Sequence, residues 1–173
     1  MRIFATILII LSAINVCFAQ EDNVQFSGAL VAEPCTLPDA DTDIRLDFGT
    51  IIASYLYEYQ KTIDKPFSIH LIDCNPELLS SVAVTFQGNE DIELPGLLAL
   101  DPGSSAKGVA LGITDAGGSK VEINKATQFR PLATGSNTIL FHAYVIIEPS
   151  ALTTRALTLG NFSAITTFLL SYQ

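Results

Sequence analysis

Apolar and polar residues alternate in many short runs along the chain. In Ile44–Phe48, Phe67–Asp73 and Val82–Phe86, every second side chain of the run is apolar. A period of two is that of a β-strand with one face turned to a core. The pattern predicts strands at Val24–Val31, Ile44–Phe48, Phe67–Asp73, Val82–Phe86, Val109–Ile113, Thr138–Ile147 and Phe162–Tyr172.

Turn signals rich in Pro, Gly, Asn and Asp separate these runs. No stretch keeps a helical period, and Pro76–Ser80 is expected to hold a helical turn at most. In Tyr55–Tyr59 tyrosines alternate with other residues, which indicates a strand or an ordered loop. Short strands with regular turns predict one all-β domain, an antiparallel sandwich of the immunoglobulin type.

The two ends of the chain are unusually apolar. The last predicted strand carries Phe162, Phe168, Leu170 and Tyr172 on one face, with only Gln173 beyond it. Chain ends are usually frayed and polar, so this strand indicates pairing with something outside the chain. Near the other end, the residues of one face are Val24, Phe26, Gly28 and Leu30. That run is either an ordinary first strand or an arm that adds itself to another molecule.

Residues 1–19 have the features of a secretory signal peptide. Arg2 precedes a mostly apolar run from Ile3 to Ile14, and Cys17–Ala19 forms a small-x-small cleavage pattern. The apolar run is shorter than the roughly twenty residues that a membrane-spanning helix needs. We expect cleavage before Gln20 and export of a soluble chain that is not an integral membrane protein.

The mature chain keeps two cysteines, Cys35 and Cys74. In an oxidising compartment a disulfide is the favoured state, with free thiols or half of a metal site as alternatives. Closing a loop of this length stabilises a domain by about 3–4 kcal/mol on the chain-entropy model.

Charge and motifs narrow the class of function. Asp and Glu number 18 against 9 Lys and Arg, a formal net charge of −9, and signal cleavage removes Arg2. An acidic chain without basic clusters argues against nucleic acids and anionic membranes as partners. The sequence has no nucleophile elbow, zinc-helix motif, phosphate loop or paired-cysteine motif. We therefore expect no enzyme activity, catalytic residue, metal or cofactor.

Two weaker signals have simple interpretations. His70 and His142 fall inside predicted strands, where a histidine is usually a surface or hydrogen-bonded residue. Three alternating acids open like a calcium loop, but Ile44 stands where such a loop needs Gly. We expect a solvated acidic turn at these three positions, which are Asp39, Asp41 and Asp43.

In combination these features resemble the pilus (fimbrial) subunits of the chaperone–usher pathway of Gram-negative bacteria. VQFSGALVAEPC resembles the family's donor-strand extension running into its first cysteine, and Cys74 stands where the partner cysteine ends a strand. VAVTFQG, LPGLLAL, GVALGITDAGG and HAYVIIEP follow in the family's order. Gly160 and the penultimate Tyr172, joined by alternating apolar residues, resemble the family's chaperone-recognition signature. The overall similarity is to minor tip or adaptor subunits.

The resemblance implies an incomplete immunoglobulin-like sandwich that lacks its final strand. Residues 20–31 would form the donor-strand extension and residues 32–173 the pilin domain. The expected partners are a periplasmic chaperone, an outer-membrane usher and neighbouring subunits of a fimbria at the cell surface. The implied groove and chaperone contacts are Gly160, Phe162, Phe168, Leu170, Tyr172 and the carboxylate of Gln173. Val24, Phe26, Gly28 and Leu30 would enter the groove of a neighbour.

A second interpretation is a stand-alone secreted binding module. In this case the disulfide-bonded sandwich would recognise a sugar or a protein through its loops. Tyr55, Tyr57 and Tyr59 would then form a contact patch, because tyrosines suit such surfaces. The alternative for these tyrosines is packing at the edge of a strand.

Overall fold

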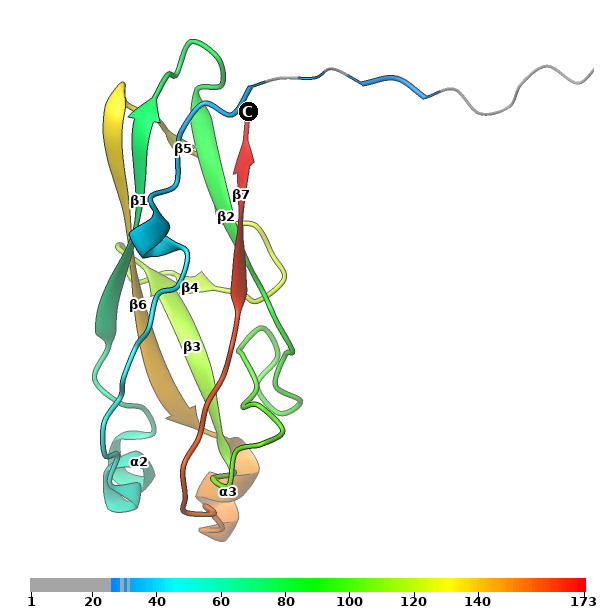
Figure 1. The fold of residues 1–173 in the computed structure, drawn as a ribbon. Coiled ribbons are helices and arrows are strands. Elements are labelled where there is room, and N and C mark those ends of the chain that lie inside the picture. Colours follow the sequence, from blue (N-terminus) through cyan, green and yellow to red (C-terminus); the bar gives the residue numbers. More distant parts are fainter. Residues whose placement is uncertain (1–25, 29, 31) are drawn as a thin grey trace, which may run out of the picture. The chain divides into compact units, whose positions relative to one another are not determined.

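The computed structural model of the chain describes residues 26–28, 30 and 32–173, so the predicted signal peptide lies outside the described residues. The chain divides into two units, Met1–Val31 and Ala32–Gln173. Figure 1 shows the second unit, which is built mainly of strands. Its elements are η1 (Asp39–Asp41), α2 (Ala53–Tyr59), β1 (Lys65–Cys74), β2 (Ser81–Gln87), β3 (Val109–Asp115), β4 (Lys120–Val121), β5 (Arg130–Pro131), β6 (Gly135–Ile147), α3 (Pro149–Thr154) and β7 (Thr167–Tyr172).

The strands form two antiparallel sheets. One has the order β1-β6-β3-β4 and the other the order β5-β2-β7. In the first sheet Phe67 lies opposite Phe141, and in the second Phe86 lies opposite Phe168. Strands far apart in the chain are therefore neighbours, and the predicted all-β antiparallel sandwich is confirmed.

Aromatic rings join the two sheets in the main core. The ring of Phe86, from β2, lies 5.1 Å edge-on from that of Phe141, from β6. Phe67, from β1, stacks on Phe141 at 5.6 Å. Edge-to-face and offset stacks at these distances are favourable ring geometries. Every second residue of these strands therefore points into the buried core between the two sheets, as the period of two predicts.

Two short helices, α2 and α3, cover the end of the core that lies away from the C-terminus (Figure 1). Leu56 of α2 and Ala151 of α3 are buried in a second cluster with Val145 of β6. The expectation of a strand or loop at Tyr55–Tyr59 is wrong, because this segment belongs to α2. Only Leu56 of this seven-residue helix is buried. A helix with one buried residue shows no repeating helical pattern of apolar positions, so the alternating tyrosines were the stronger signal in the sequence.

Other differences concern segment ends and partners. The last strand begins at Thr167 and not at Phe162, and Pro76–Leu78 forms a turn. The described part of Val24–Val31, residues 26–28 and 30, is not in a strand. Ile44–Phe48 is not a strand either, and the reason appears below. Among residues 26–28, 30 and 32–173, no helix has the length and apolar character to cross a bilayer.

The outer face of the larger sheet carries one tight contact. The ring of Tyr144 lies across Gly112 on the neighbouring strand, where the two residues are register partners. A Cβ atom on Gly112 would lie 2.2 Å from Cζ of Tyr144. A strand glycine of this kind marks a close approach that any side chain would block.

Replacing Gly112 with Ala should therefore destabilise the domain. We expect a loss of about 1–3 kcal/mol in the free energy of unfolding, the usual cost of overpacking. Gly103→Ala is the matched control, because a Cβ there meets nothing within 4 Å. Urea titrations of dilute, freshly refolded subunit, followed by circular dichroism, measure both, and equal midpoints for the two variants would contradict the contact.

Candidate functional site

The segment from Gly160 to Gln173 alternates in burial between Asn161 and Leu170. Its even-numbered apolar side chains are half-buried against the core, whereas Ile165 and Leu169 are 75% and 50% exposed. The half-buried set is Phe162, Ala164, Phe168, Leu170 and Tyr172. These side chains form a continuous apolar row, of the parity that the sequence indicates.

The backbone of β7 pairs with β2 on one side only. Gln173 and Ser81 exchange both backbone hydrogen bonds, with N–H to O distances of 3.1 and 3.0 Å. In an antiparallel ladder the residues that bond to the partner alternate with residues that face away. Phe168, Leu170 and Tyr172 therefore turn their N–H and C=O groups away from β2, toward the outer edge of the three-stranded sheet.

The odd-numbered residues that precede β7 are bonded in the same way as those of β7. Asn161 and Ser163 form hydrogen bonds with the amides and hydroxyls of the loop at residues 101–105. Asn161 N donates to Ser105 Oγ at 3.0 Å and Ser163 N donates to Ser104 Oγ at 3.0 Å. Gly160 permits this approach, since a Cβ there would lie 2.4 Å from Ser105 Oγ.

The even-numbered residues from Gly160 to Tyr172 consequently share one property. Within residues 32–173, no hydrogen bond joins their backbone groups to the chain on the side away from β2. We call this row of backbone groups the open edge. An open edge with apolar side chains beneath it is a template for a further strand.

A second extended segment, Ile44–Phe48, lies across from the open edge, and we call the space between the two the gap. In Ile44–Phe48 the side chains of Ile44, Leu46 and Phe48 are half-buried and those between them are exposed. No backbone–backbone hydrogen bond joins this segment to any described residue. The strand predicted here is wrong for that reason: the side chains alternate as in a strand, but the backbone has no ladder partner.

Side chains hold this segment in place. Lys65 Nζ donates to the carbonyl of Asp47. Further along, the backbone N–H of His70 donates to Asp41 Oδ2, and His70 Nδ1 lies 2.8 Å from the same oxygen. Asp41 is 7% exposed, so the expectation of a fully solvated acidic turn is wrong for this residue. Asp41 instead connects η1, which precedes Ile44–Phe48, to β1.

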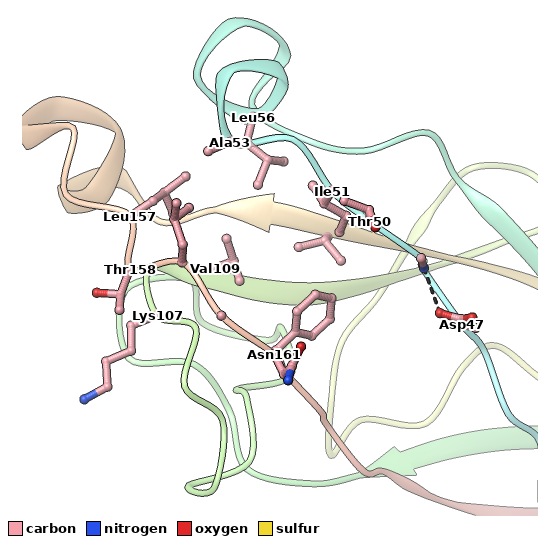
Figure 2. A pocket seen from close by; sticks show the side chains of 15 residues that line it. Asp47, Thr50, Ile51, Ala53, Leu56, Lys107, Val109, Leu157, Thr158 and Asn161 are labelled. Atoms are coloured by element: carbon pink, nitrogen blue, oxygen red, sulfur yellow. Dashed lines mark hydrogen bonds between the residues drawn. The ribbon is translucent and has the colours of Figure 1, made fainter.

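A cleft opens at one end of the gap between the two segments. Figure 2 shows this cleft, which has a volume of about 500 Å³ and is lined by residues of 47–56 and 157–162. The ring centroids of Phe48 and Phe162 are 6.4 Å apart, with the ring planes tilted by 41°. Val109 and Val145 contribute to its lining. The cleft is therefore apolar at its base and open to an incoming side chain.

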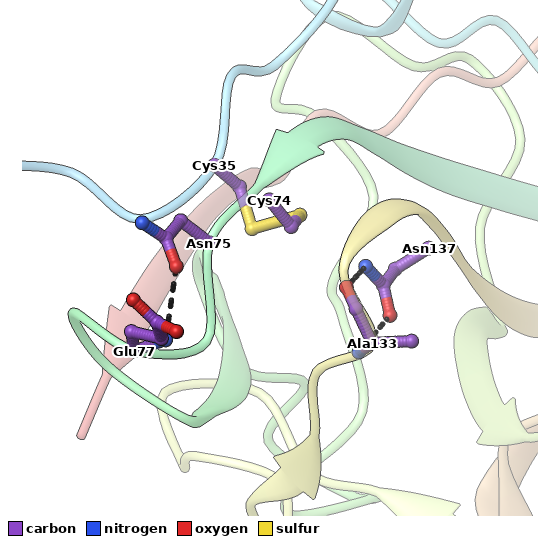
Figure 3. The surroundings of a disulfide bond; sticks show 6 residues. All are labelled: Cys35, Cys74, Asn75, Glu77, Ala133 and Asn137. Atoms are coloured by element: carbon purple, nitrogen blue, oxygen red, sulfur yellow. Dashed lines mark hydrogen bonds between the residues drawn. A yellow bond between two sulfur atoms is a disulfide. The ribbon is translucent and has the colours of Figure 1, made fainter.

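At the opposite end a disulfide holds the chain before η1 against the larger sheet. Cys35 and Cys74 form the predicted disulfide, which joins this stretch to the end of β1 (Figure 3). Gln173 O accepts hydrogen bonds from Ser80 N at 2.8 Å and Ser81 N at 3.0 Å. Burial, and secondarily the charge of Glu33, raises the pKa of Tyr172. Tyr172 thus lies close to the residues that precede the disulfide.

The other residues named from the sequence, those of the predicted arm and the three tyrosines, do not lie together at the gap. Phe26 and Leu30 are 92% and 104% exposed, Gly28 is exposed, and Val24 lies outside the described residues. Tyr57 turns inward, where its hydroxyl accepts from Leu157 N at 3.1 Å, so the three tyrosines do not form one patch. In the part of the chain that the structure describes, no group of three His, Cys, Asp or Glu could hold a metal.

Comparisons with known proteins agree on one family. The model of the family described as fimbrial protein matches residues 24–173. The uncharacterized fimbrial-like protein YfcP of Escherichia coli (strain K12) is 33% identical over 166 residues, 95% of this chain and 90% of that protein. The putative minor fimbrial subunit PmfF of Proteus mirabilis (strain HI4320) is 30% identical over 152 residues, 87% and 84% of the two chains. A chain from a chaperone–usher pilus has a TM-score of 0.70 at 25% identity, covering 89% of this chain and 96% of that one.

The open edge predicts a pattern of amide exchange along β7. We expect the amides of Phe168, Leu170 and Tyr172 to exchange at least roughly tenfold faster than those of Leu169 and Ser171, because only the latter bond to β2. Hydrogen–deuterium exchange read by NMR measures this on dilute subunit freshly refolded from denaturant, before it can aggregate. The odd-numbered amides are the internal control, and equal protection along the strand would contradict an open edge.

Proposed function

The chain belongs to the fimbrial protein family and is a structural subunit of a surface fimbria, and we propose that it polymerises by donor-strand exchange. In this proposal residues 20–31 of one subunit form an arm. The arm enters the gap beside β7 in the domain, residues 32–173, of the neighbouring subunit. The immunoglobulin-like sandwich of the neighbour then gains its missing strand.

The open edge is the observation that carries this proposal. The even-numbered backbone groups of Gly160–Tyr172 face the gap on one side, and the unpaired backbone of Ile44–Phe48 lies on the other. One inserted strand can bond to both, and main-chain bonds supply affinity in this mode of recognition. Each Val, Phe or Leu side chain buried at the same time contributes about 1.5–3 kcal/mol.

The direction of the arm follows from the architecture. The missing last strand of such a sandwich runs antiparallel to the strand before it, here β7. An antiparallel arm places its Leu30 end near Gly160 and Phe162, where the cleft offers room for a side chain. Its Val24 end then lies toward Tyr172. Gly28 comes two residues before Leu30, so it sits one inward position, about 6.6 Å, from the cleft.

Before assembly, another protein must cover the open edge. We propose a periplasmic chaperone that lends a strand to the gap, followed by an outer-membrane usher where the arm of the next subunit replaces that strand. The half-buried row of Phe162, Phe168, Leu170 and Tyr172 is the surface that such a strand covers. The carboxylate of Gln173, at the end of β7, would contact basic groups of the chaperone.

Dependence on a chaperone is directly testable. Residues 20–173 expressed alone in the periplasm should aggregate or be degraded, because the apolar row and open edge remain uncovered. Expressed with the chaperone of the same pilus system, the chain should elute in size-exclusion chromatography as a stable one-to-one complex. A well-behaved isolated monomer with a high unfolding temperature would contradict the proposal.

Side-chain size at Gly28 should decide whether the arm can insert. Gly28→Leu puts a large side chain on the inward face, and we expect polymerisation to stop while the chaperone complex still forms. Ser27→Leu is the matched control, because residue 27 has the opposite parity and points outward. Electron microscopy and gel assays of assembled fibres compare the two. Normal fibres from Gly28→Leu would refute the role of the arm.

A further inference from the structure

A second cavity lies on the flank of the domain, with a lining that shares no residue with the cleft beside Phe162. It has a volume of about 740 Å³. Its lining comes from α2, the loop that follows it, the turn after β3 and the outer face of β6. This volume is within the usual range of about 300–1,000 Å³ for small-molecule sites. Donor-strand pairing does not account for this cavity.

Two tyrosines form one wall of the cavity. Tyr55 and Tyr59 lie four residues apart on α2, and their ring centroids are 4.5 Å apart. The two residues remain 36% and 57% exposed. Tyrosine offers a rigid apolar ring face together with a hydroxyl that can donate or accept, at a low cost in side-chain entropy. The wall is thus suited to stack against a flat, partly polar ligand.

Polar side chains converge on the cavity from three other elements. Lys61 Nζ lies 3.0 Å from Asp64 Oδ1 and 4.7 Å from the centre of the Tyr144 ring, so its position is fixed from two sides. Thr114 of β3 and His142 of β6 contribute from the sheet. His142 and Thr114 are register partners in the ladder between β6 and β3, so their side chains lie side by side on this face. The cavity therefore combines donors and acceptors with an aromatic wall.

The charges narrow the chemistry of the ligand. Lys61 is paired with Asp64, and the chain as a whole carries −9, so an anionic ligand would meet no net positive charge. The polar lining disfavours a purely apolar ligand, which would leave these groups without partners. A protein interface usually has few charged residues in its centre, whereas here a Lys–Asp pair lines a hollow.

We propose that this cavity binds a neutral saccharide. A sugar ring has an apolar face of C–H groups, which would stack on Tyr59 and Tyr55. Its hydroxyls can donate to Asp64 and accept from Lys61, and can do both with His142 and Thr114. Where several copies of this subunit occur in one fimbria, weak binding at each cavity would be strengthened by multivalency.

Saturation-transfer NMR tests this site with a defined probe set. The methyl glycosides of glucose, galactose, mannose and N-acetylglucosamine are mixed with the mature chain as purified from the periplasm, and any co-purifying protein is measured alone as a blank. We expect transfer to the ring C–H protons of at least one glycoside. Tyr59→Ala should reduce it roughly fivefold through loss of stacking.

Two further variants make the test specific. Tyr59→Phe keeps the ring and should retain most of the transfer, whereas His142→Ala should lower it while leaving the unfolding temperature near that of the parent. Absence of transfer from all four glycosides, or equal transfer in the parent and Tyr59→Ala, would overturn the proposal. Chaperone binding and fibre assembly are unaffected by either outcome, so failure here is distinguishable from failure of donor-strand exchange.

Discussion

The demand of backbone groups for hydrogen-bond partners governs this structure. A β-strand satisfies only half of its N–H and C=O groups on each side, and β7 has a partner on one side. In water the other half can be solvated, but the side chains of the same residues are apolar and lie over the core. At the open edge of β7 the backbone groups need hydrogen-bond partners, while the apolar side chains need to be buried from water. A further strand bonded to this edge satisfies both.

Much of the remaining architecture keeps that place available. The disulfide of Cys35 and Cys74 and the Asp41–His70 contact hold residues 35–41, which lead into Ile44–Phe48, along β1. On the other side the hydroxyls of Ser104 and Ser105 stand in for a neighbouring strand and fix the lower part of the last segment. The gap is therefore kept open by its walls, and collapse of one segment onto the other would require these contacts to break.

Sequence alone predicted the sheets well, and it predicted which face of the last segment packs on the core. The alternation in Phe67–Asp73, Val82–Phe86 and the last segment reports directly which side chains face the core, because the pleat imposes a period of two. It says nothing about partners, which is why Ile44–Phe48 was predicted as a paired strand. The helix at α2 rests on one buried leucine, too little for a periodic signal. The cleft and the flank cavity arise from segments distant in the chain, so no local pattern indicates them.

The pairing of β2 with β7 also sets an order in time. An exported chain crosses the inner membrane from its amino end, so Ser81–Gln87 emerges long before Thr167–Tyr172 can reach it. Until then β2 is itself an edge, adjacent to a half-built core. Sequence-distant pairings of this kind close slowly. A newly secreted subunit therefore passes through an interval with two vacant strand positions instead of one, and the rates of translocation and of strand closure together set its length.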